Sequence, residues 1–232
     1  MLQQTQTDRV SDKFLQFIKK FPDFLTLSHA PLDEVLATWQ GLGYNRRAIA
    51  LKKIAEIIIN KYKGQLPESV EILQSFPQIG HNTASSIVTY AFNKPTVFIE
   101  TNIRRVYIYF FFPGKVKVTD KDILSILEKT IDKTNPREWY YALMDYGVML
   151  KKTYPNLNKR SAQYRKQTPF KGSDRQIRGE ILKILLRIND LKIADIEKQL
   201  KNVTLTRLYK ILDQLEKEGF IILEDDIIRI VR

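Results

Sequence analysis

Three kinds of residue or segment are scarce in this chain, and each absence excludes a class of protein. There is no cysteine, which excludes disulfides, thiolate catalysis and a cysteine-ligated iron–sulfur cluster. Two histidines, His29 and His81, argue against a histidine-based metal site. No apolar run reaches the roughly 18 residues that span a bilayer, and the first residues lack the basic start and apolar stretch of a secretory signal. We therefore expect a cytoplasmic protein with no membrane partner.

What the chain has in abundance is positive charge. It carries a formal net charge of +12 in 232 residues, and 44% of those residues are hydrophobic, which is enough to build a core. A basic protein of this kind binds polyanions by neutralising phosphates and releasing their counterions. The charge favours a nucleic-acid partner over the alternative, a basic protein whose charges serve solubility alone.

Helical periodicity dominates the first two-thirds of the chain. Apolar residues recur at helical spacing, and proline or glycine separates the segments. Val106 to Phe112 is the one ambiguous stretch, because on propensity alone it also fits a buried strand. The helices that the pattern predicts are residues 3–21, 31–39, 45–62, 69–75, 82–91, 100–112, 120–133 and a last one that opens at 136.

A tight turn joins two of these helices within the stretch Phe76–Ser85. Pro77 breaks the first helix, and we expect Gly80 to take the left-handed conformation that lets the second begin. The first amides of a helix carry the positive end of its dipole and form a phosphate site. Glu100 follows Gly80 by twenty residues and opens the next predicted helix, where an acidic residue can serve simply as the N-cap or as a first-turn acid.

The composition changes after Thr153. A polar, basic stretch is followed by three helical patterns, 175–187, 193–200 and 205–219, and by two apolar runs around Glu224-Asp225-Asp226. Three helices and a terminal hairpin predict a winged-helix-like module, whose third helix would read DNA. An equal alternative is that the module binds a protein or packs on the first domain. We predict domains at 1–153 and 174–232, joined by a basic linker at 154–173. The module's candidate DNA contacts are Thr204, Thr206, Arg207, Tyr209 and Lys210.

The turn and its surroundings resemble the helix-hairpin-helix element of the base-excision DNA glycosylases. Four further segments are similar to adenine DNA glycosylases, the MutY-like group. They are Met1–Thr7, Leu32–Leu36, Trp39-Gln40-Gly41-Leu42-Gly43-Tyr44 and Ala142–Gly147. The resemblance covers residues 1 to about 152. It implies an all-α, two-lobed helix-hairpin-helix glycosylase fold, here with the winged-helix-like module of three helices and a β-hairpin at its C-terminus. It also implies that the target nucleotide is flipped out of duplex DNA.

The resemblance also implies roles for individual residues. The carboxylate of Glu100 would stabilise an oxocarbenium-like sugar. Asn102 would orient this carboxylate or hold a nearby phosphate. The resemblance further implies a monovalent cation at the hairpin and no other metal. It implies a monomer that acts in the nucleoid on double-stranded DNA with a mismatch or lesion. The implied DNA-binding residues are Gln3, Gln4, Thr5, Tyr44, Gln78, Gly80, His81, Asn82, Thr83, Arg104 and Arg105, and the implied base pocket is Tyr141, Met144 and Asp145.

The sequence departs from the family pattern at several positions. Glu100 replaces an aspartate, and Tyr141 stands where adenine glycosylases present glutamine or glutamate. Asn82 stands where strand-cleaving relatives have lysine, so we expect no Schiff base and a monofunctional enzyme. The family's general-acid glutamate precedes the residue matched by Met1, so either it is missing or the chain is truncated.

We predict base-excision repair by a DNA glycosylase that releases a mismatched base, with adenine opposite guanine or 8-oxoguanine favoured. Two alternatives stay open. One is a non-catalytic DNA-binding protein on a glycosylase scaffold, and the other is a glycosylase for thymine or uracil opposite guanine.

Overall fold

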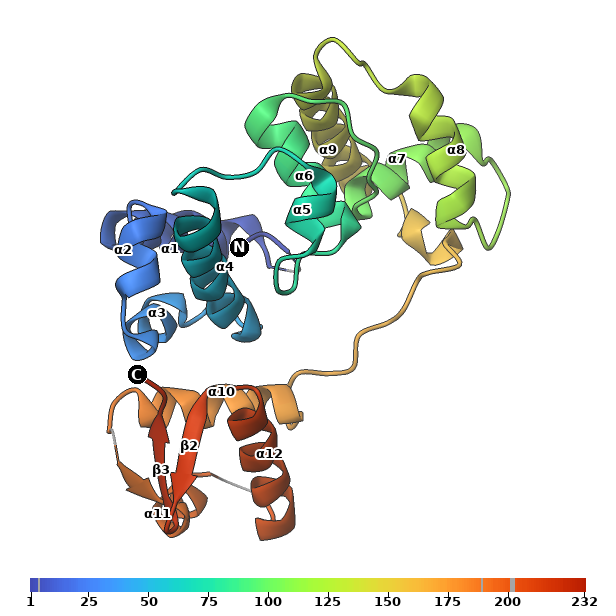
Figure 1. The fold of residues 1–232 in the computed structure, drawn as a ribbon. Helices are drawn as coiled ribbons and strands as arrows, with labels where there is room; N and C mark the ends of the chain where they lie inside the picture. The colour runs from blue at the N-terminus through green and yellow to red at the C-terminus, as the bar shows by residue number, and fades with distance from the viewer. Residues whose placement is uncertain (4, 189, 201–202) are drawn as a thin grey trace. The chain divides into compact units, whose positions relative to one another are not determined.

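The computed structural model describes residues 1–3, 5–188, 190–200 and 203–232 (Figure 1). It divides the chain into two compact units, which we describe separately. Unit 1 comprises Met1–Leu66 and Thr168–Arg232, and unit 2 comprises Pro67–Gln167. One division, after Leu66, falls inside the predicted first domain, and the other, after Gln167, falls inside the predicted linker. The domain boundaries at 153 and 173 stay a prediction. Within the described ranges no helix is both long and apolar enough to cross a bilayer.

Unit 1 begins with four helices. They are α1 (Thr7–Lys20), α2 (Phe24–His29), α3 (Leu32–Trp39) and α4 (Arg46–Tyr62). The prediction that the first helix begins at Gln3 was wrong, because it begins at Thr7 after an extended Gln6. The sequence reading also missed α2, although Asp23 caps it by accepting a hydrogen bond from the Thr26 amide at 2.7 Å. Proline and aspartate in succession are a helix-start signal that could have revealed α2.

The C-terminal part of unit 1 is the winged-helix-like module. It contains α10 (Asp174–Leu185), β1 (Leu191–Lys192), α11 (Ile193–Gln199), α12 (Leu205–Lys217), β2 (Ile221–Glu224) and β3 (Ile227–Ile230). The three helices and the terminal hairpin are confirmed. The structure adds the short strand β1, so that the sheet has the antiparallel order β1-β3-β2, with Ile228 between Leu191 and Leu223. Two residues are too few for alternation to reveal a strand.

Unit 2 carries the hairpin and Glu100. Its elements are α5 (Val70–Gln74), α6 (His81–Phe92), α7 (Thr101–Phe111), α8 (Asp120–Thr130), α9 (Pro136–Thr153) and the 3₁₀ turn η1 (Leu157–Arg160). The ambiguous stretch 106–112 is helical as far as Phe111. Ile103, Tyr107 and Ile108 are buried, whereas Phe110 is half exposed, so one face of the helix meets the core. Burial on one helical face thus overrides the strand propensity of the β-branched and aromatic residues.

The interior of unit 2 fixes where α7 begins. Phe98 and Ile99, buried just before the helix, anchor the extended segment that leads into it. The ring of Phe98 stacks on Tyr140 of α9 with centroids 4.1 Å apart. Tyr140 also accepts a hydrogen bond from the Phe98 amide at 3.3 Å and donates one to the Thr96 carbonyl at 2.9 Å. Glu100, the next residue after this anchored pair, therefore has a defined position.

Candidate nucleic-acid interface and active site

The hairpin turn is built differently from the sequence prediction. Gly80 has φ −86° and ψ 173°, which is extended backbone, so the expectation of a left-handed glycine there was wrong. Gln78 instead has φ 59°, in the left-handed region. Pro77 and Gln78 are the two central residues of a turn that the Ile79 amide closes onto the Phe76 carbonyl at 3.2 Å. A positive φ at the third residue is the signature of a type II turn, where glycine is the favoured residue.

Gly80 is the N-cap of α6, and no side chain caps this helix start. A Cβ placed on Gly80 would meet no atom within 4 Å, so space is open beside its backbone. Gln78, Gly80, His81 and Asn82 are all exposed, and Thr83 is half-buried. The turn thus presents the first amides of a twelve-residue helix, the geometry that binds phosphate.

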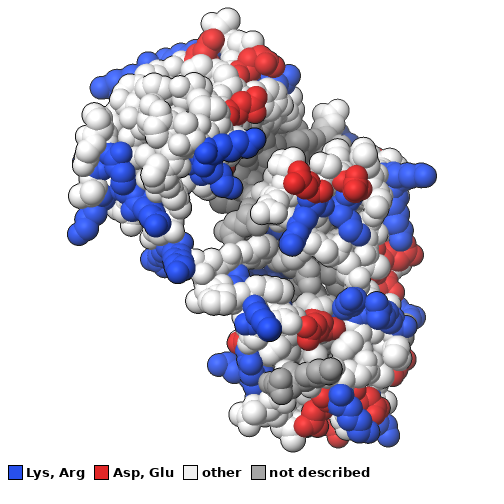
Figure 2. Space-filling view, turned by 180° about the vertical axis from the view of Figure 1, so that it is seen from behind, with Lys and Arg blue, Asp and Glu red and all other residues white. Residues whose placement is uncertain are grey.

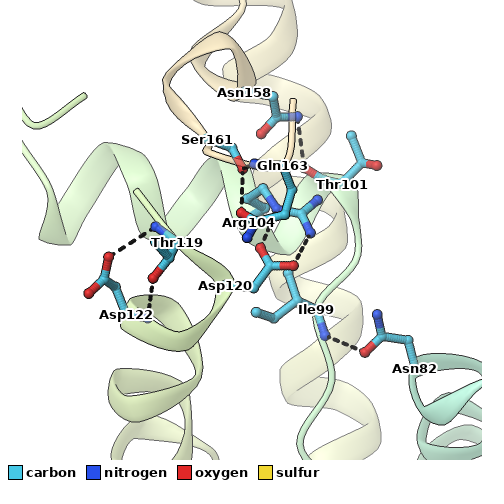
Figure 3. A network of polar contacts seen from close by, with 10 residues as sticks. All are labelled: Asn82, Ile99, Thr101, Arg104, Thr119, Asp120, Asp122, Asn158, Ser161 and Gln163. Atoms are coloured by element: carbon cyan, nitrogen blue, oxygen red, sulfur yellow. Dashed lines mark hydrogen bonds and ion pairs between the residues drawn. The ribbon is translucent and has the colours of Figure 1, made fainter. Parts of the chain in front are cut away.

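Two hydrogen bonds tie this helix start to the segment that leads to Glu100. The His81 Nε2 lies 3.1 Å from the Val97 carbonyl. The Asn82 side-chain oxygen accepts a hydrogen bond from the Ile99 amide at 3.3 Å (Figure 3). His81 and Asn82, predicted to contact DNA, therefore also have a structural role, which fixes the hairpin relative to Glu100.

Glu100 is the N-cap of α7. Its Oε1 accepts hydrogen bonds from the Asn102 amide at 2.5 Å and the Ile103 amide at 3.3 Å. Within the described part of the chain its Oε2 has no hydrogen bond, and the side chain is half-buried. The carboxylate is thus held by one oxygen, and the other remains available for an outside group. Asn102 positions Glu100 through its main-chain N–H rather than through its side chain.

The Asn102 side chain serves Arg105. Its Oδ1 accepts a hydrogen bond from Arg105 Nη1 at 2.6 Å, and the same nitrogen donates to the Gly147 carbonyl of α9 at 2.6 Å. Arg105 is only 4% exposed, and its burial lowers the pKa of the guanidinium, while the charge of Glu100 acts in the opposite direction. A Cβ on Gly147 would lie 2.5 Å from the Asn102 carbonyl oxygen, so glycine permits this close approach of α7 and α9.

Arg104 is also held within unit 2. Its Nε and Nη2 donate to the two carboxylate oxygens of Asp120 at 2.9 Å each, a bidentate pair at the start of α8 (Figure 3). The sequence reading assigned Arg104 and Arg105 to DNA phosphates. The structure gives both side chains intramolecular partners, and their contact with phosphates stays a prediction.

An aromatic cluster lies beside the carboxylate, and the sequence analysis missed its central member, Tyr90 of α6. Its ring stacks on Tyr141 with centroids 5.1 Å apart and an interplanar angle of 16°. Burial raises the pKa of Tyr90, and the neighbouring charge of Glu100 adds to the effect, so the phenol stays protonated at neutral pH. Tyr141 is 46% exposed, and Tyr90 and Tyr141 together present a stacked aromatic surface near Glu100. Of the other predicted pocket residues, Met144 is half-buried and Asp145 is exposed.

The predicted DNA contacts near the N-terminus lie in unit 1, and one arginine organises them. Arg47 Nη1 donates to the carbonyls of Met1 and Gln3 at 3.0 and 2.8 Å, and Nη2 donates to Thr5 Oγ1 at 3.1 Å. Its guanidinium also lies 5.3 Å from the centre of the Tyr44 ring. Gln3, Thr5 and Tyr44 are thereby brought together, whereas Gln4 lies outside the described residues. No pattern in the sequence pointed to Arg47, which looks there like an ordinary first-turn helix residue.

Two of the predicted DNA contacts on α12, the expected recognition helix of the module, have intramolecular partners. Thr204 caps α12 by accepting from the Arg207 amide at 3.4 Å, and Arg207 itself donates to Asp174 and to the Gly172 carbonyl, each at 2.8 Å. Thr206, Tyr209 and Lys210 are exposed. At the tip of the wing Glu224 pairs with Arg229 at 2.7 Å, and the next two residues, Asp225 and Asp226, carry negative charge that would repel a phosphate backbone.

Comparison with known proteins now decides the family. Residues 1–133, more than half of the chain, match the HhH-GPD superfamily of base excision DNA repair proteins. The chain belongs to this superfamily. Within the HhH-GPD proteins it is 37% identical to an adenine DNA glycosylase of Buchnera aphidicola subsp. Baizongia pistaciae over 65% of this chain and 43% of that protein. It is 30% identical to the adenine DNA glycosylase of Mycolicibacterium smegmatis over 80% of this chain and 69% of that protein.

Solved structures show the same fold. A thermostable thymine-DNA glycosylase matches with a TM-score of 0.55 and 22% identity, over 64% of this chain and 70% of that one. A trapped endonuclease III–DNA covalent intermediate matches with a TM-score of 0.54 and 21% identity, over 73% of each chain. The chain spans less than half the length of the Buchnera relatives. The predicted family and the helix-hairpin-helix fold are confirmed.

The described residues include no group of three or more histidine, cysteine, aspartate or glutamate side chains that could hold a metal ion. The chain also has no thiolate for an iron–sulfur cluster. The expected monovalent cation at the hairpin would rest on neutral main-chain carbonyls, because residues 76–83 contain no carboxylate. Such a donor set fits a singly charged ion.

Proposed function

We propose that this HhH-GPD protein is a monofunctional DNA N-glycosylase that releases adenine opposite guanine or 8-oxoguanine in duplex DNA. The observation that carries the proposal is the Glu100 carboxylate at the start of α7, fixed by two amides and placed beside the hairpin through the Asn82–Ile99 hydrogen bond. The similarity to adenine DNA glycosylases over 154 residues supports adenine as the base. Action on nucleoid DNA in the cytoplasm goes with this proposal.

The carboxylate suits the chemistry of N-glycosidic cleavage. When the bond between sugar and base breaks, its electrons leave with the base and positive charge develops on the sugar ring. A negative charge fixed beside the anomeric carbon stabilises that state, and one preorganised group of this kind contributes about 10²–10³ in rate. Two features of Glu100 support this role: Oε1 is held by two main-chain amides, and Oε2 has no partner among the described residues.

The reaction ends with water. The water oxygen bonds to the anomeric carbon and the water loses one proton, while the departing base takes up one proton. The product is an abasic site. Asn82 supports this monofunctional course, because an amide cannot form the Schiff base that a lysine forms. Its side-chain oxygen is moreover engaged with the Ile99 amide.

The hairpin would hold the DNA while the nucleotide is flipped. The start of α6, open beside Gly80, would bind a phosphate through main-chain N–H groups, and a monovalent cation on the carbonyls of the turn would add positive charge there. The stacked pair Tyr90–Tyr141 would offer a flat surface to the extruded base. In unit 1, Gln3, Thr5 and Tyr44 would contact the opposite strand, in the arrangement that Arg47 maintains.

The test is single-turnover base release from four duplexes with A:8-oxoG, A:G, T:G and U:G pairs, followed by alkali to cut abasic sites. Wild type is compared with Glu100→Gln, which keeps an oxygen for the two amides but removes the charge. Glu128→Gln, on the exposed side of α8, is the matched control. We expect adenine release to fall about 100-fold or more in Glu100→Gln and to remain unchanged in Glu128→Gln.

Each other outcome has a definite meaning. Release from T:G or U:G alone would reject adenine and keep a glycosylase. Binding to all four duplexes with no release from any would reject catalysis by this chain in favour of a DNA-binding scaffold. Equal release by wild type and Glu100→Gln would reject Glu100 as the catalytic carboxylate.

A further inference from the structure

The linker at residues 154–173 has an unusual charge distribution. It contains five lysine or arginine residues and no aspartate or glutamate, and the acid-free stretch extends from Tyr146 to Ser173 with seven basic residues in all. The C-terminal module after it is almost neutral, with twelve basic and eleven acidic residues in 174–232. More than half of the chain's net charge of +12 thus lies in this short acid-free stretch.

The linker is anchored at both ends. At its start, the Val118 amide donates to the Arg160 carbonyl at 2.9 Å, and the Ala162 amide donates to the Val118 carbonyl at 2.8 Å. At its end, Arg175 donates to the Thr168 carbonyl at 2.8 Å. Residues 162–172 are exposed and contain no helix or strand. The side chains of this span are therefore open to solvent.

Three cations on this exposed span have no protein partner. Across the residues that the structure describes, Arg165, Lys166 and Lys171 form no hydrogen bond and no ion pair. Arg160, by contrast, donates to the Lys115 carbonyl at 2.9 Å and is tied to the body of unit 2. In the space-filling view blue side chains accompany the linker, whereas blue and red alternate over the C-terminal module (Figure 2). The unpaired charges are available to an external anion.

Exposed aromatic rings stand next to these cations. Tyr164 precedes Arg165 and is 39% exposed, and Phe170 precedes Lys171 and is 62% exposed. Cations interleaved with aromatic rings are typical of nucleic-acid surfaces, where phosphates meet the charges and sugars or bases meet the rings. The first part of the linker belongs to unit 2, the same unit as the hairpin and Glu100. Asn158 of η1 also donates to the Thr101 carbonyl at 3.1 Å, beside Glu100 (Figure 3).

We propose that the linker is a second DNA-contacting segment, in which Arg165 and Lys166 at the end of unit 2 and Lys171 at the start of the C-terminal part of unit 1 bind phosphates of duplex DNA. The proposal rests on the proposed function only in taking duplex DNA as the ligand. It assigns the electrostatic contact to the linker and not to the module, whose wing tip is acidic. The chain would therefore hold DNA at two places, with base extrusion at one of them.

The test is the salt dependence of binding to an undamaged duplex, which needs no catalysis. The variant Arg165→Gln/Lys166→Gln/Lys171→Gln is compared with Lys121→Gln/Lys129→Gln/Lys133→Gln, which removes the same charge from exposed positions on and after α8. Each phosphate contact contributes about 0.9 to the slope of log K against log salt. We expect the slope of the linker variant to shrink by up to about 2.7 and that of the control to stay close to wild type.

Three results would overturn the proposal. One is a wild-type slope in the linker variant, and another is an equal decrease in both variants, which would indicate net charge alone. The third is a larger loss on vesicles of anionic phospholipid than on the duplex. Because the slope is measured without base release, absence of release would reject the proposed function and leave this result standing.

Discussion

Two helix starts in unit 2 are handled in opposite ways. The first amides of α7 are taken by the chain's own carboxylate, Glu100, whereas the start of α6 has no side-chain cap and open space beside Gly80. Both starts carry the positive end of a helix dipole. The difference shows that one helix start is neutralised by a carboxylate of the chain itself, whereas the other leaves its first amides without a side-chain cap; in the proposed function the first would position the catalytic carboxylate and the second would bind a DNA phosphate. Substitutions at four positions test this contrast.

Gly147→Ala should have the largest effect, because it disturbs the platform on which the α7 start rests. The new methyl group would lie 2.5 Å from the Asn102 carbonyl oxygen and push α7 and α9 apart. Overpacking of this kind costs about 2–3 kcal/mol. The measurement is the free energy of unfolding in urea. Gly179→Ala is the control, since a Cβ there meets nothing within 4 Å and alanine should stabilise α10 by about 0.5–1 kcal/mol. Equal behaviour of the two variants would contradict the close helix contact.

Glu100→Ala should come next, since it turns the capped start into an uncapped one. Loss of an N-cap side chain costs about 1 kcal/mol in unfolding free energy. Glu100→Gln should cost less, because its side-chain oxygen can still accept from the Asn102 and Ile103 amides. Thermal and urea unfolding of both variants provide the comparison. A Gln variant as unstable as the Ala variant would show that the amide oxygen does not replace the carboxylate as a cap.

Gly80→Ala tests the open start of α6, where we expect DNA affinity to change and stability to stay nearly constant. The φ of −86° suits alanine and the site has room for its methyl group, so stability should change by less than about 0.5 kcal/mol. That methyl would occupy the space through which a phosphate approaches. We expect duplex affinity to fall about tenfold, the equivalent of one charge-assisted hydrogen bond. Fluorescence anisotropy measures it, and unchanged affinity would remove Gly80 from the interface.

Gln78→Gly should have the smallest effect and is expected to stabilise. A left-handed glutamine costs about 1–2 kcal/mol, and the greater freedom of unfolded glycine offsets part of the gain, which leaves about 0.5 kcal/mol. Lys63→Gly, at a φ of 52° after α4, is the matched control outside the hairpin. Similar gains at both positions would show that the strain is local. Destabilisation by Gln78→Gly alone would mean that the glutamine side chain supports the turn.

The sequence predicted the hairpin, the order of the helices and the winged-helix-like module, because these depend on local signals such as Pro77, the apolar periodicity of α12 and the two terminal strands. It missed which residue of the turn takes the positive φ, since glycine is the usual choice and here Gln78 takes it. The distant partners of Arg104 and Arg105 could not be predicted. Arg104 pairs with Asp120, sixteen residues away, and Arg105, besides Asn102 on its own helix, donates to the Gly147 carbonyl, forty-two residues away. Only the tertiary fold brings these distant partners together.

Arg47 has a consequence for how variants of this protein are compared. One guanidinium joins the carbonyls of Met1 and Gln3 to the Thr5 hydroxyl and, through Nη2 at 3.3 Å, to the Gly43 carbonyl before Tyr44. Substitutions in the N-terminal segment and in the Gly43–Tyr44 turn should therefore show epistasis, because each alters the hydrogen bonds available to the other. A substitution at Thr5 should therefore have a different cost in a variant whose Gly43–Tyr44 turn is altered, because the two segments share Arg47, which belongs to neither.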